Sequence, residues 1–143
     1  MSVPSSLRLP APVNQGVRLF VMLHESHTFN AKALLPESWR TDSFHYCKFE
    51  LITDLSESLE GCYLGTEFEA CHWYWGHFNC STFVSCTFKN CRFNGTSFSS
   101  CKFVECTFEN CDFGIDNMGQ HCSFEDCRWY GCTQLNCNGM PAL

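Results

Sequence analysis

The chain has 143 residues and a formal net charge of −6 at neutral pH, and it contains 14 Phe and 13 Cys. A chain of this length suits one domain with its own core, and the abundance of Phe excludes a disordered protein. No run reaches the roughly 18 apolar residues of a membrane helix, and the longest apolar run, 19-LFVML-23, is too short for a signal peptide. We therefore expect a cytoplasmic protein without a membrane partner.

The N-terminal part of the chain shows no repeat. The stretch 17-VRLFVML-23 is rich in Val, Leu and Phe and predicts a short strand, while four prolines interrupt the rest of residues 1–41. Its apolar side chains suit a segment that covers the open end of a repetitive structure. We predict that residues 1–41 form an N-terminal capping segment with a strand near residues 17–23.

From residue 42 onward an apolar residue, usually Phe, recurs every five positions, as in 86-CTFKNCRFNG-95 and 106-CTFENCDFGI-115. We call this residue the centre of each unit. The predicted centres are Phe44, Phe49, Leu59, Leu64, then after one missing residue Phe68, Trp73, Phe78, Phe83, Phe88, Phe93, Phe98, Phe103, Phe108, Phe113 and Met118, and after one extra residue near Gln120, Phe124 and Trp129. The cysteines that stand two places before a centre are Cys47, Cys62, Cys71, Cys86, Cys91, Cys101, Cys106, Cys111, Cys122 and Cys127. The repeat thus organises most of the chain.

A period of five matches neither the 3.6-residue helix nor the two-residue strand, so the chain must turn a corner in every unit. Four sides then close a square coil of about 20 residues, and successive coils stack at about 4.8 Å. The pattern resembles the pentapeptide-repeat family, with Cys at its small position. The resemblance implies an all-β fold, a right-handed quadrilateral β-helix of about four to five coils over residues 42–137, with a C-terminal tail at residues 138–143.

The cysteines suit buried, reduced thiols better than a disulfide framework. Their number is odd, their spacing follows the repeat, and the sequence contains no Cys-x-x-Cys pair. A small thiol fits the narrow inward position beside each corner. His72 and His77 fall on neighbouring sides of the coil without an evident third ligand. We therefore expect neither a bound metal nor another cofactor.

Negative charge is concentrated near the start of the repeat. Residues 42–69 contain seven acids against Lys48 alone, and Lys and Arg interrupt the later coils. Direct binding to nucleic acid requires basic patches, so this distribution argues against it. Because residues 20 apart should stack, we predict outward rows with a structural role. These rows are Glu69, Lys89, Glu109 and Tyr130; His72, Arg92 and Asp112; Val84, Val104 and Glu125; and Asn90 with Asn110.

The stretch 71-CHWYWGHFNC-80 departs from the pattern. Trp73 is a centre, but its neighbours place large aromatic and imidazole groups at outward positions. Tyr and Trp are enriched where partners bind, so we predict a contact site here. The alternative is that the N-terminal cap covers Tyr74 and Trp75. Together with acids of the first coils, the predicted partner-binding residues are Glu57, Glu60, Glu67, Glu69, His72, Tyr74, Trp75 and His77.

Catalysis is not expected. A solenoid with a filled axis offers no pocket, and the sequence contains neither a phosphate loop nor a nucleophile elbow. Within the family that the chain resembles, some members mimic duplex DNA and bind DNA gyrase, and others are partner-specific proteins found beside secreted bacterial toxins. The resemblance therefore implies a protein-binding role.

We expect a non-enzymatic, immunity-type or inhibitory protein whose acidic and aromatic first coils neutralise a bacterial toxin or enzyme with a basic surface. Acidic patches steer encounters with basic partners, which motivates this choice. One alternative is a DNA-mimicking binder of DNA gyrase or topoisomerase. Another is a self-associating structural or effector module. A monomer and an end-to-end homodimer both remain open.

Overall fold

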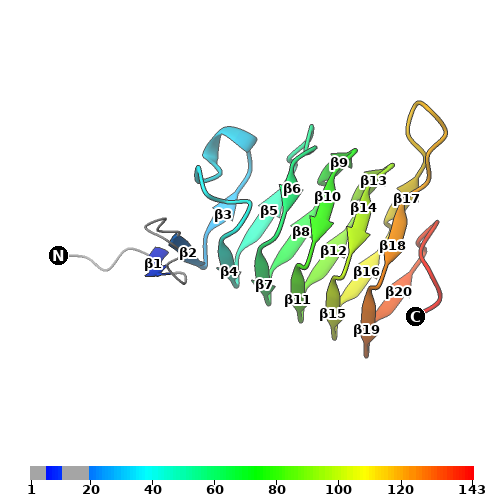
Figure 1. Cartoon of the computed structure of the whole chain (residues 1–143). Helices are drawn as coiled ribbons and strands as arrows, with labels where there is room; N and C mark the ends of the chain where they lie inside the picture. Colours follow the sequence, from blue (N-terminus) through cyan, green and yellow to red (C-terminus); the bar gives the residue numbers. More distant parts are fainter. Residues whose placement is uncertain (1–5, 11–19) are drawn as a thin grey trace, which may run out of the picture.

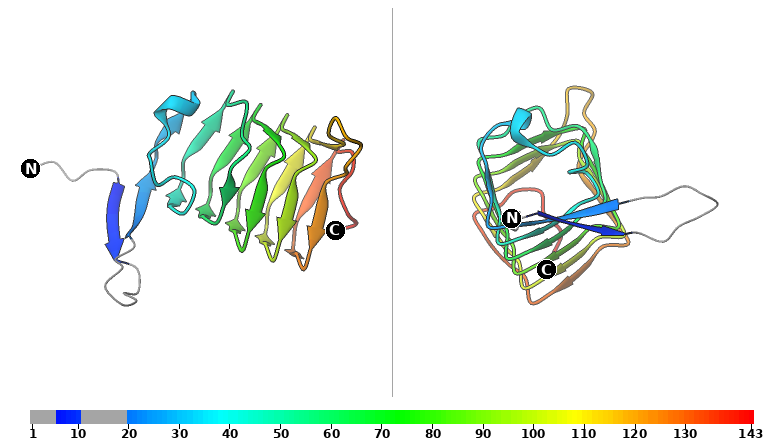
Figure 2. Two further views of the ribbon diagram at one scale, coloured as in Figure 1. Left: turned by 45° about the horizontal axis from the view of Figure 1, so that its top comes forward. Right: turned by 90° about the vertical axis from the view of Figure 1, so that its left-hand side faces the viewer.

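The computed structural model describes residues 6–10 and 20–143, in which short strands stack side by side along one axis (Figure 1). Seen along that axis, the coils have a four-sided outline (Figure 2). The strands and a 3-10 turn are β1 (Ser6–Pro10), β2 (Phe20–Glu25), β3 (Thr28–Phe29), η1 (Lys32–Leu34), β4 (Ser43–His45), β5 (Lys48–Glu50), β6 (Ser58–Leu59), β7 (Cys62–Leu64), β8 (Glu67–Glu69), β9 (His72–Tyr74), β10 (His77–Asn79), β11 (Thr82–Val84), β12 (Thr87–Lys89), β13 (Arg92–Asn94), β14 (Ser97–Ser99), β15 (Lys102–Val104), β16 (Thr107–Glu109), β17 (Asp112–Gly114), β18 (Ser123–Glu125), β19 (Arg128–Tyr130) and β20 (Thr133–Leu135).

The strands form four sheets, one on each side of the coil. The sheet orders are β1-β2-β4-β7-β11-β15-β19, β20-β16-β12-β8-β5-β3, β17-β13-β9 and β18-β14-β10-β6. The β1–β2 pair is antiparallel. The coil strands are parallel and in register, so that Phe83 of β11 pairs with Phe103 of β15. The predicted fold class, an all-β quadrilateral β-helix, is confirmed.

Each regular unit is a three-residue strand followed by a corner. In β12 the ring of Phe88 points to the axis, whereas Thr87 and Lys89 flank it on the outside. The corner residue Asn90 adopts a left-handed backbone with φ of 54°. This conformation is uncommon for residues other than Gly. The Asn90 N–H donates to the carbonyl of Glu109 in the next coil at 2.9 Å, and this bond helps to offset the cost.

The axis is filled by columns of parallel rings. The ring of Phe88 lies 4.7 Å from that of Phe68 and 4.8 Å from that of Phe108, with interplanar angles of 5° and 4°. Beside the rings, Cys91 is fully buried and its thiol donates to the Phe68 carbonyl at 3.3 Å. Stacked aromatic pairs stabilise a core beyond simple burial of their area. The Cys/Phe repeat therefore builds a core of stacked rings lined by thiols.

The register of the first coil differs from the predicted one. Tyr63, not Leu64, is the centre, because it pairs with Phe44 and only 2 % of its surface is exposed. Cys62 therefore lies directly beside a centre and is exposed. The residue missing from the period falls before Tyr63, since Leu59 and Tyr63 are only four positions apart.

The prediction of Met118 as a centre is also wrong, because 77 % of its surface is exposed. Phe98 pairs with Phe124, which is 26 residues further along the chain. Six extra residues therefore separate these coils. They form part of the loop between β17 and β18, which we call the 115–121 loop.

This insertion also changes the predicted outward rows. Val104 pairs with Tyr130, and Glu109 pairs with Leu135. Glu125 pairs with Ser99 instead. The predicted rows allow for one extra residue in the loop, whereas the structure has six. The predicted members in the last coil are therefore wrong.

The described part of the N-terminal segment already stacks on the coils. Strand β2 pairs with β4 and β3 with β5, both in parallel. His24 takes the place of a ring and lies 4.8 Å from Phe44. Residues 17–19 of the strand predicted near 17–23 lie outside the described residues, and the division of the chain at residues 41 and 137 stays a prediction. No helix in residues 6–10 and 20–143 is long and apolar enough to cross a membrane.

Candidate protein-contact site

The predicted partner-binding residues occupy three adjacent sides of the coil. Glu67 and Glu69 flank the centre of β8, and His72 and Tyr74 flank that of β9. Trp75 is the corner residue that follows β9, and His77 lies on β10. The two remaining acids stand on either side of β6. The aromatic residues are thus brought together at one corner, whereas the acids are distributed around it.

Most of the predicted acids form ion pairs. Lys48 Nζ lies 3.3 Å from Glu69 and 3.7 Å from Glu67, and Lys89 Nζ lies 3.7 Å from Glu67. Hydrogen bonds to Glu50 and Glu69 raise the pKa of Lys48. Among the residues that the structure describes, Glu60 forms no ion pair. The acidic surface is therefore weaker than the sequence charge indicates.

Glu57 is paired with the 3-10 turn η1. Its carboxylate lies 2.5 Å from Lys32 Nζ. Partial burial opposes the ionisation of Glu57, but the hydrogen bond from Lys32, the backbone N–H groups of Glu57 and Ser56 and the charge of Lys32 together outweigh that effect and lower the carboxyl pKa. Exposed pairs of this kind contribute little stability. Their main effect here is to reduce the free negative charge at this edge of the coil.

Tyr74 and Trp75 form an aromatic corner. Their rings lie 5.0 Å apart, and the imidazole of His72 meets the Tyr74 ring edge-on at 6.2 Å. His72 Nε2 is 2.7 Å from Asn94 Oδ1 in the next coil. Half of the Trp75 surface is exposed, because a corner side chain with φ of 59° points away from the axis.

The 115–121 loop folds back over two coils and binds this corner. Trp75 Nε1 donates to Asp116 Oδ2 at 2.7 Å, and the Asn117 N–H donates to the Tyr74 hydroxyl at 2.6 Å. Asn94 Nδ2 also donates to the carbonyl of Ile115 at 2.9 Å. Among residues 6–10 and 20–143, the side-chain hydrogen bonds of Tyr74 and Trp75 thus come from this loop, and none comes from the described part of the N-terminal cap that sequence reasoning considered.

Asp116 holds the loop in shape. Its Oδ1 accepts from the N–H groups of Met118 at 2.8 Å and Gln120 at 2.9 Å. Burial of the carboxyl opposes ionisation, but the bonds from Gln120, Trp75 and Met118 outweigh that effect and lower the Asp116 pKa. Gly95 lets the loop pass, since a Cβ there would lie 2.7 Å from Asp116 Oδ2. Asp116 of the loop and Gly95 at the coil corner are therefore sterically complementary.

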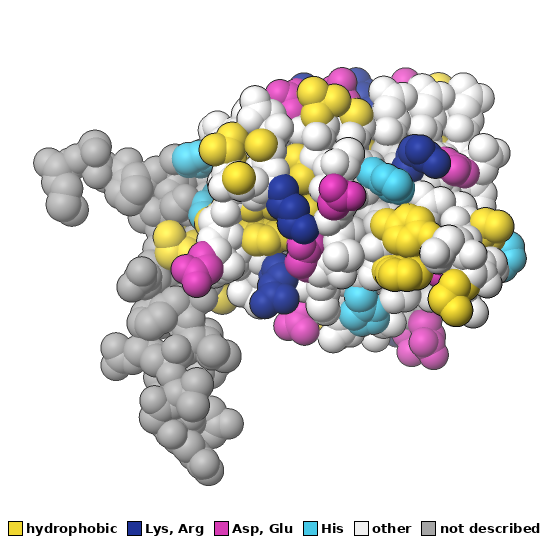
Figure 3. All heavy atoms as spheres, turned by 90° about the horizontal axis from the view of Figure 1, so that it is seen from above, with side chains coloured by type: hydrophobic (Ala, Val, Ile, Leu, Met, Phe, Trp, Pro, Cys, Tyr) yellow, Lys and Arg dark blue, Asp and Glu magenta, His cyan; other side chains and the backbone are white. Residues whose placement is uncertain are grey.

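The loop and the corner together present exposed apolar side chains. The exposed fractions are 50 % for Trp75, 51 % for Ile115 and 77 % for Met118. Figure 3, which views the molecule from above, shows hydrophobic side chains gathered on this face beside His side chains. We call Tyr74, Trp75, Ile115 and Met118 the loop patch. Sequence reasoning missed its loop half, although 115-IDNMGQ-120 lacks both a small residue and a Phe at the repeat positions.

The described residues contain no group of three or more His, Cys, Asp or Glu side chains placed to hold one metal ion. His72 and His77 are instead engaged by neighbouring polar groups, Asn94 and Ser97.

Comparison with known proteins identifies the repeat. Residues 77–114 match the family profile of pentapeptide repeats in eight copies. No curated protein matches the chain. Among solved structures, a trypsin-treated variant of QnrB1, described as a plasmid-mediated fluoroquinolone resistance protein, is 14 % identical and has a TM-score of 0.38 over 80 % of this chain and 68 % of that one.

A second trypsin-treated QnrB1 variant is also 14 % identical, with a TM-score of 0.34 and the same coverage of both chains. The pentapeptide-repeat protein Rfr23 from the cyanobacterium Cyanothece 51142 is 8 % identical, with a TM-score of 0.20 over 80 % of this chain and 86 % of its own. The family match and the five-residue register of the stacked coils agree, so residues 77–114 are pentapeptide repeats.

Proposed function

We propose that the chain is a non-enzymatic binding protein of the immunity or inhibitor type, which neutralises a bacterial toxin or enzyme through the loop patch and the acids beside it. The observation that carries this proposal is the docking of the 115–121 loop on Tyr74 and Trp75. An insertion that merely interrupted the repeat would not need a matching Gly corner and a buried carboxylate.

The loop patch has the properties of a binding hot spot. Its centre is a half-exposed Trp75 next to Tyr74, and these two residue types dominate binding energy at protein interfaces. The loop is already ordered by hydrogen bonds in the free protein, which lowers the entropy lost on binding. Exposed apolar groups gathered at one place also mark interaction sites on soluble proteins.

The nearby acids indicate that the contact surface of the proposed partner is positively charged. Glu60 has no ion pair in the described part of the chain, and Glu67 and Glu69 share Lys48 and Lys89. A partner with a basic surface can compete for these carboxylates and approach faster because of them. The acids therefore serve association rate more than affinity.

A DNA-mimicking role is a weaker candidate. Such a mimic needs an uninterrupted negative surface along the rod. In the sheet that contains β8 and β12, Lys48 and Lys89 stand between the acids and pair with them. For that reason the proposal names a basic protein surface and not the DNA site of a topoisomerase.

The test begins with capture of partners from lysate of the source organism by the full chain. Binding of the captured partner is then measured for Trp75→Ala and for a variant that lacks residues 115–120. This deletion leaves Phe113-Gly114-His121-Cys122-Ser123-Phe124, which restores the five-residue spacing and should preserve the coil. We expect each change to weaken binding by more than about 30-fold, as for a hot spot of about 2 kcal/mol or more.

Tyr130→Ala is the matched control, because Tyr130 is similarly exposed, at 48 %, on another side of the coil. It should leave affinity unchanged. Equal loss of affinity in the control, or full affinity in the deletion variant, would refute the loop patch as the contact site. Capture of a type II topoisomerase as the sole stoichiometric partner would favour the DNA-mimicking role instead.

A further inference from the structure

The last coil stacks thiols directly on those of the coil before it. The strand pairs Lys102–Arg128 and Thr107–Thr133 and the bridge Asp112–Asn138 set this register. The residue directly before each of these paired residues is a cysteine. Cys127 is therefore stacked on Cys101, Cys132 on Cys106, and Cys137 on Cys111. Three corners of the last coil thus carry a vertical pair of cysteines. At two of them the column continues into earlier coils, with Cys86 below Cys106, and Cys91 and Cys71 below Cys111.

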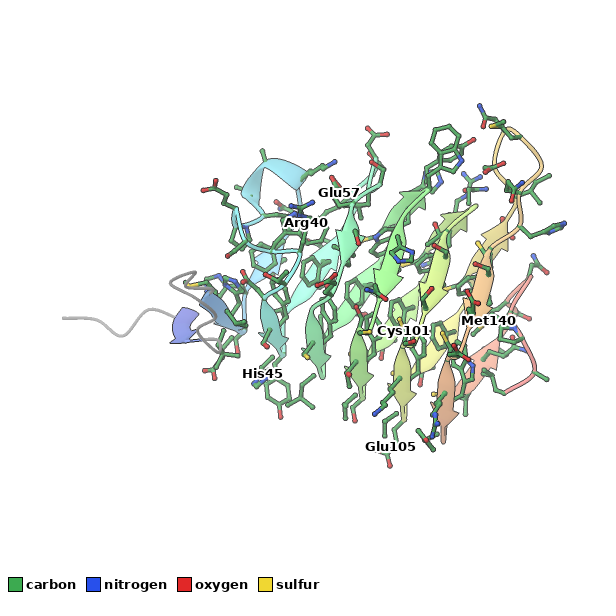
Figure 4. The ribbon with its side chains drawn as sticks, in the orientation of Figure 1. Arg40, His45, Glu57, Cys101, Glu105 and Met140 are labelled. Atoms are coloured by element: carbon green, nitrogen blue, oxygen red, sulfur yellow. The ribbon has the colours of Figure 1, made fainter. Side chains whose placement is uncertain are left out.

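In each pair one thiol is closed off and the other is accessible. The lower thiols, Cys101, Cys106 and Cys111, are at most 1 % exposed. The upper thiols are only partly buried. Figure 4 labels Cys101 inside the wall of the solenoid. An ion or reagent can therefore reach each pair from the side of its upper thiol.

The strand register places the two cysteines of a pair at equivalent positions of neighbouring coils. Cys137 Sγ accepts the N–H of Cys111 at 3.4 Å, which places the sulfur over the lower cysteine. Both thiols are otherwise bonded only to backbone carbonyls, as in the 3.3 Å bond from Cys127 to Phe98.

The spacing of the strands decides which chemistry suits such a pair. Parallel strands hold equivalent atoms about 4.8 Å apart. A disulfide needs sulfurs about 2.05 Å apart, so the coils would have to distort. Two metal–sulfur bonds in a line, each near the roughly 2.3 Å of a Zn–S bond, span about 4.6 Å, which is close to the spacing of the strands. Soft thiolate ligands select soft ions such as Cu(I).

We propose that the thiol pairs Cys101–Cys127, Cys106–Cys132 and Cys111–Cys137 each bind one soft monovalent d10 cation such as Cu⁺ in linear, two-coordinate geometry. One cation and two neutral thiols give an anionic bis-thiolate complex and two protons, which leave to solvent. No group changes its oxidation state. Such a site needs neither a third ligand nor a Cys-x-x-Cys pair, which are the features whose absence led us to expect no bound metal.

Charge near the pairs predicts an order of affinity. Lys102 and Arg128 follow Cys101 and Cys127 in the chain, and neither forms a salt bridge in the described residues. Together they outweigh Asp126, which precedes Cys127, so they can offset the negative complex. The second pair has Glu105 beside it and the third has Asp112, and neither pair has an adjacent cation. The first pair should therefore bind most tightly.

The experiment uses the full chain, reduced and kept without oxygen, with Cu⁺ supplied from its coloured bicinchoninate complex. Loss of colour gives the affinity, and native mass spectrometry counts the ions. We expect three ions on the wild type, two on Cys127→Ser with the tightest one lost, and none on the triple variant Cys127→Ser, Cys132→Ser, Cys137→Ser. The double variant Cys62→Ser, Cys80→Ser is the control and should keep three, because these exposed cysteines have no cysteine stacked on them.

Unchanged ion counts in the triple variant, or loss of ions in the control, would overturn the proposal. X-ray absorption of the Cu⁺-loaded wild type provides a second test that does not depend on how the variants fold. It should show two sulfur neighbours; three or more ligands would also overturn it. This inference is independent of the partner-binding function, which can fail without affecting it.

Discussion

The regular coils and the 115–121 loop are stabilised in opposite ways. In the coils each residue type follows from its place in the unit, and rings such as Phe83 and Phe103 stack at 4.9 Å. The loop contains no buried ring, and its shape depends on hydrogen bonds to Asp116 and on Gly95. The repeat thus provides most of the stability, whereas the surface features that distinguish this protein from a regular coil lie where the repeat is interrupted.

The largest effect should follow from breaking a ring column in a regular coil. Phe83 is fully buried between Tyr63 at 4.8 Å and Phe103 at 4.9 Å. Phe83→Ala should lower the free energy of unfolding by about 3–5 kcal/mol, through lost burial and the cavity that it leaves. Urea unfolding followed by circular dichroism measures this change.

Phe124→Ala is the comparison for this measurement, because Phe124 in the last coil is stacked on one side only, on Phe98 at 5.0 Å. Its loss should cost clearly less than that of Phe83. Equal losses of unfolding free energy would show that a ring stacked on both sides adds no more stability than a ring stacked on one side.

A smaller effect should follow from separating the loop from the coil. In Gly95→Ala the new Cβ would lie 2.7 Å from the Asp116 carboxylate, so the loop must move. Gly131→Ala is the matched control, since Gly131 has φ of +63° and its Cβ would meet its nearest atom only at 3.6 Å. Gly95→Ala should lower the free energy of unfolding by about 1 kcal/mol more than Gly131→Ala does, which is the value of a lost hydrogen bond.

Limited proteolysis separates the two glycine variants further. Cleavage within residues 115–121 should become faster in Gly95→Ala and stay unchanged in Gly131→Ala. Equal protection in both variants would mean that the loop is not held by this corner.

The smallest effect is a dependence on pH. Because the Asp116 pKa is lowered in the folded protein, its bonds stabilise the loop above the unfolded pKa of about 3.9 and lose this effect as pH falls through the lower folded value. The loop should stay docked from neutral pH to about 4 and be released only in stronger acid. The NMR signal of the Trp75 indole N–H reports the release, with Asp116→Asn as a control that should not titrate. Release between pH 5 and 7 would contradict the assignment to Asp116.

Some of the site was accessible to sequence reasoning and some was not. The outward aromatic residues Tyr74 and Trp75 follow from their places relative to the centre Trp73, and the structure has them at these places. Their contacts with Asp116 and Asn117 join residues 41 and 43 positions apart. Such contacts require the stacking of coils, which no local pattern contains. Whether these residues bind a partner stays a prediction.

The sequence by itself determined the period, the fold class and nearly all of the residues on the axis, because each five-residue unit obeys the same steric demands. Only the tertiary structure decided how coils are matched across the irregular places. One extra residue and six extra residues shift a period of five equally, so the sequence placed Met118 on the axis. Strand pairing distinguishes the two cases, since Phe98 must stack on a ring one full coil away and meets Phe124.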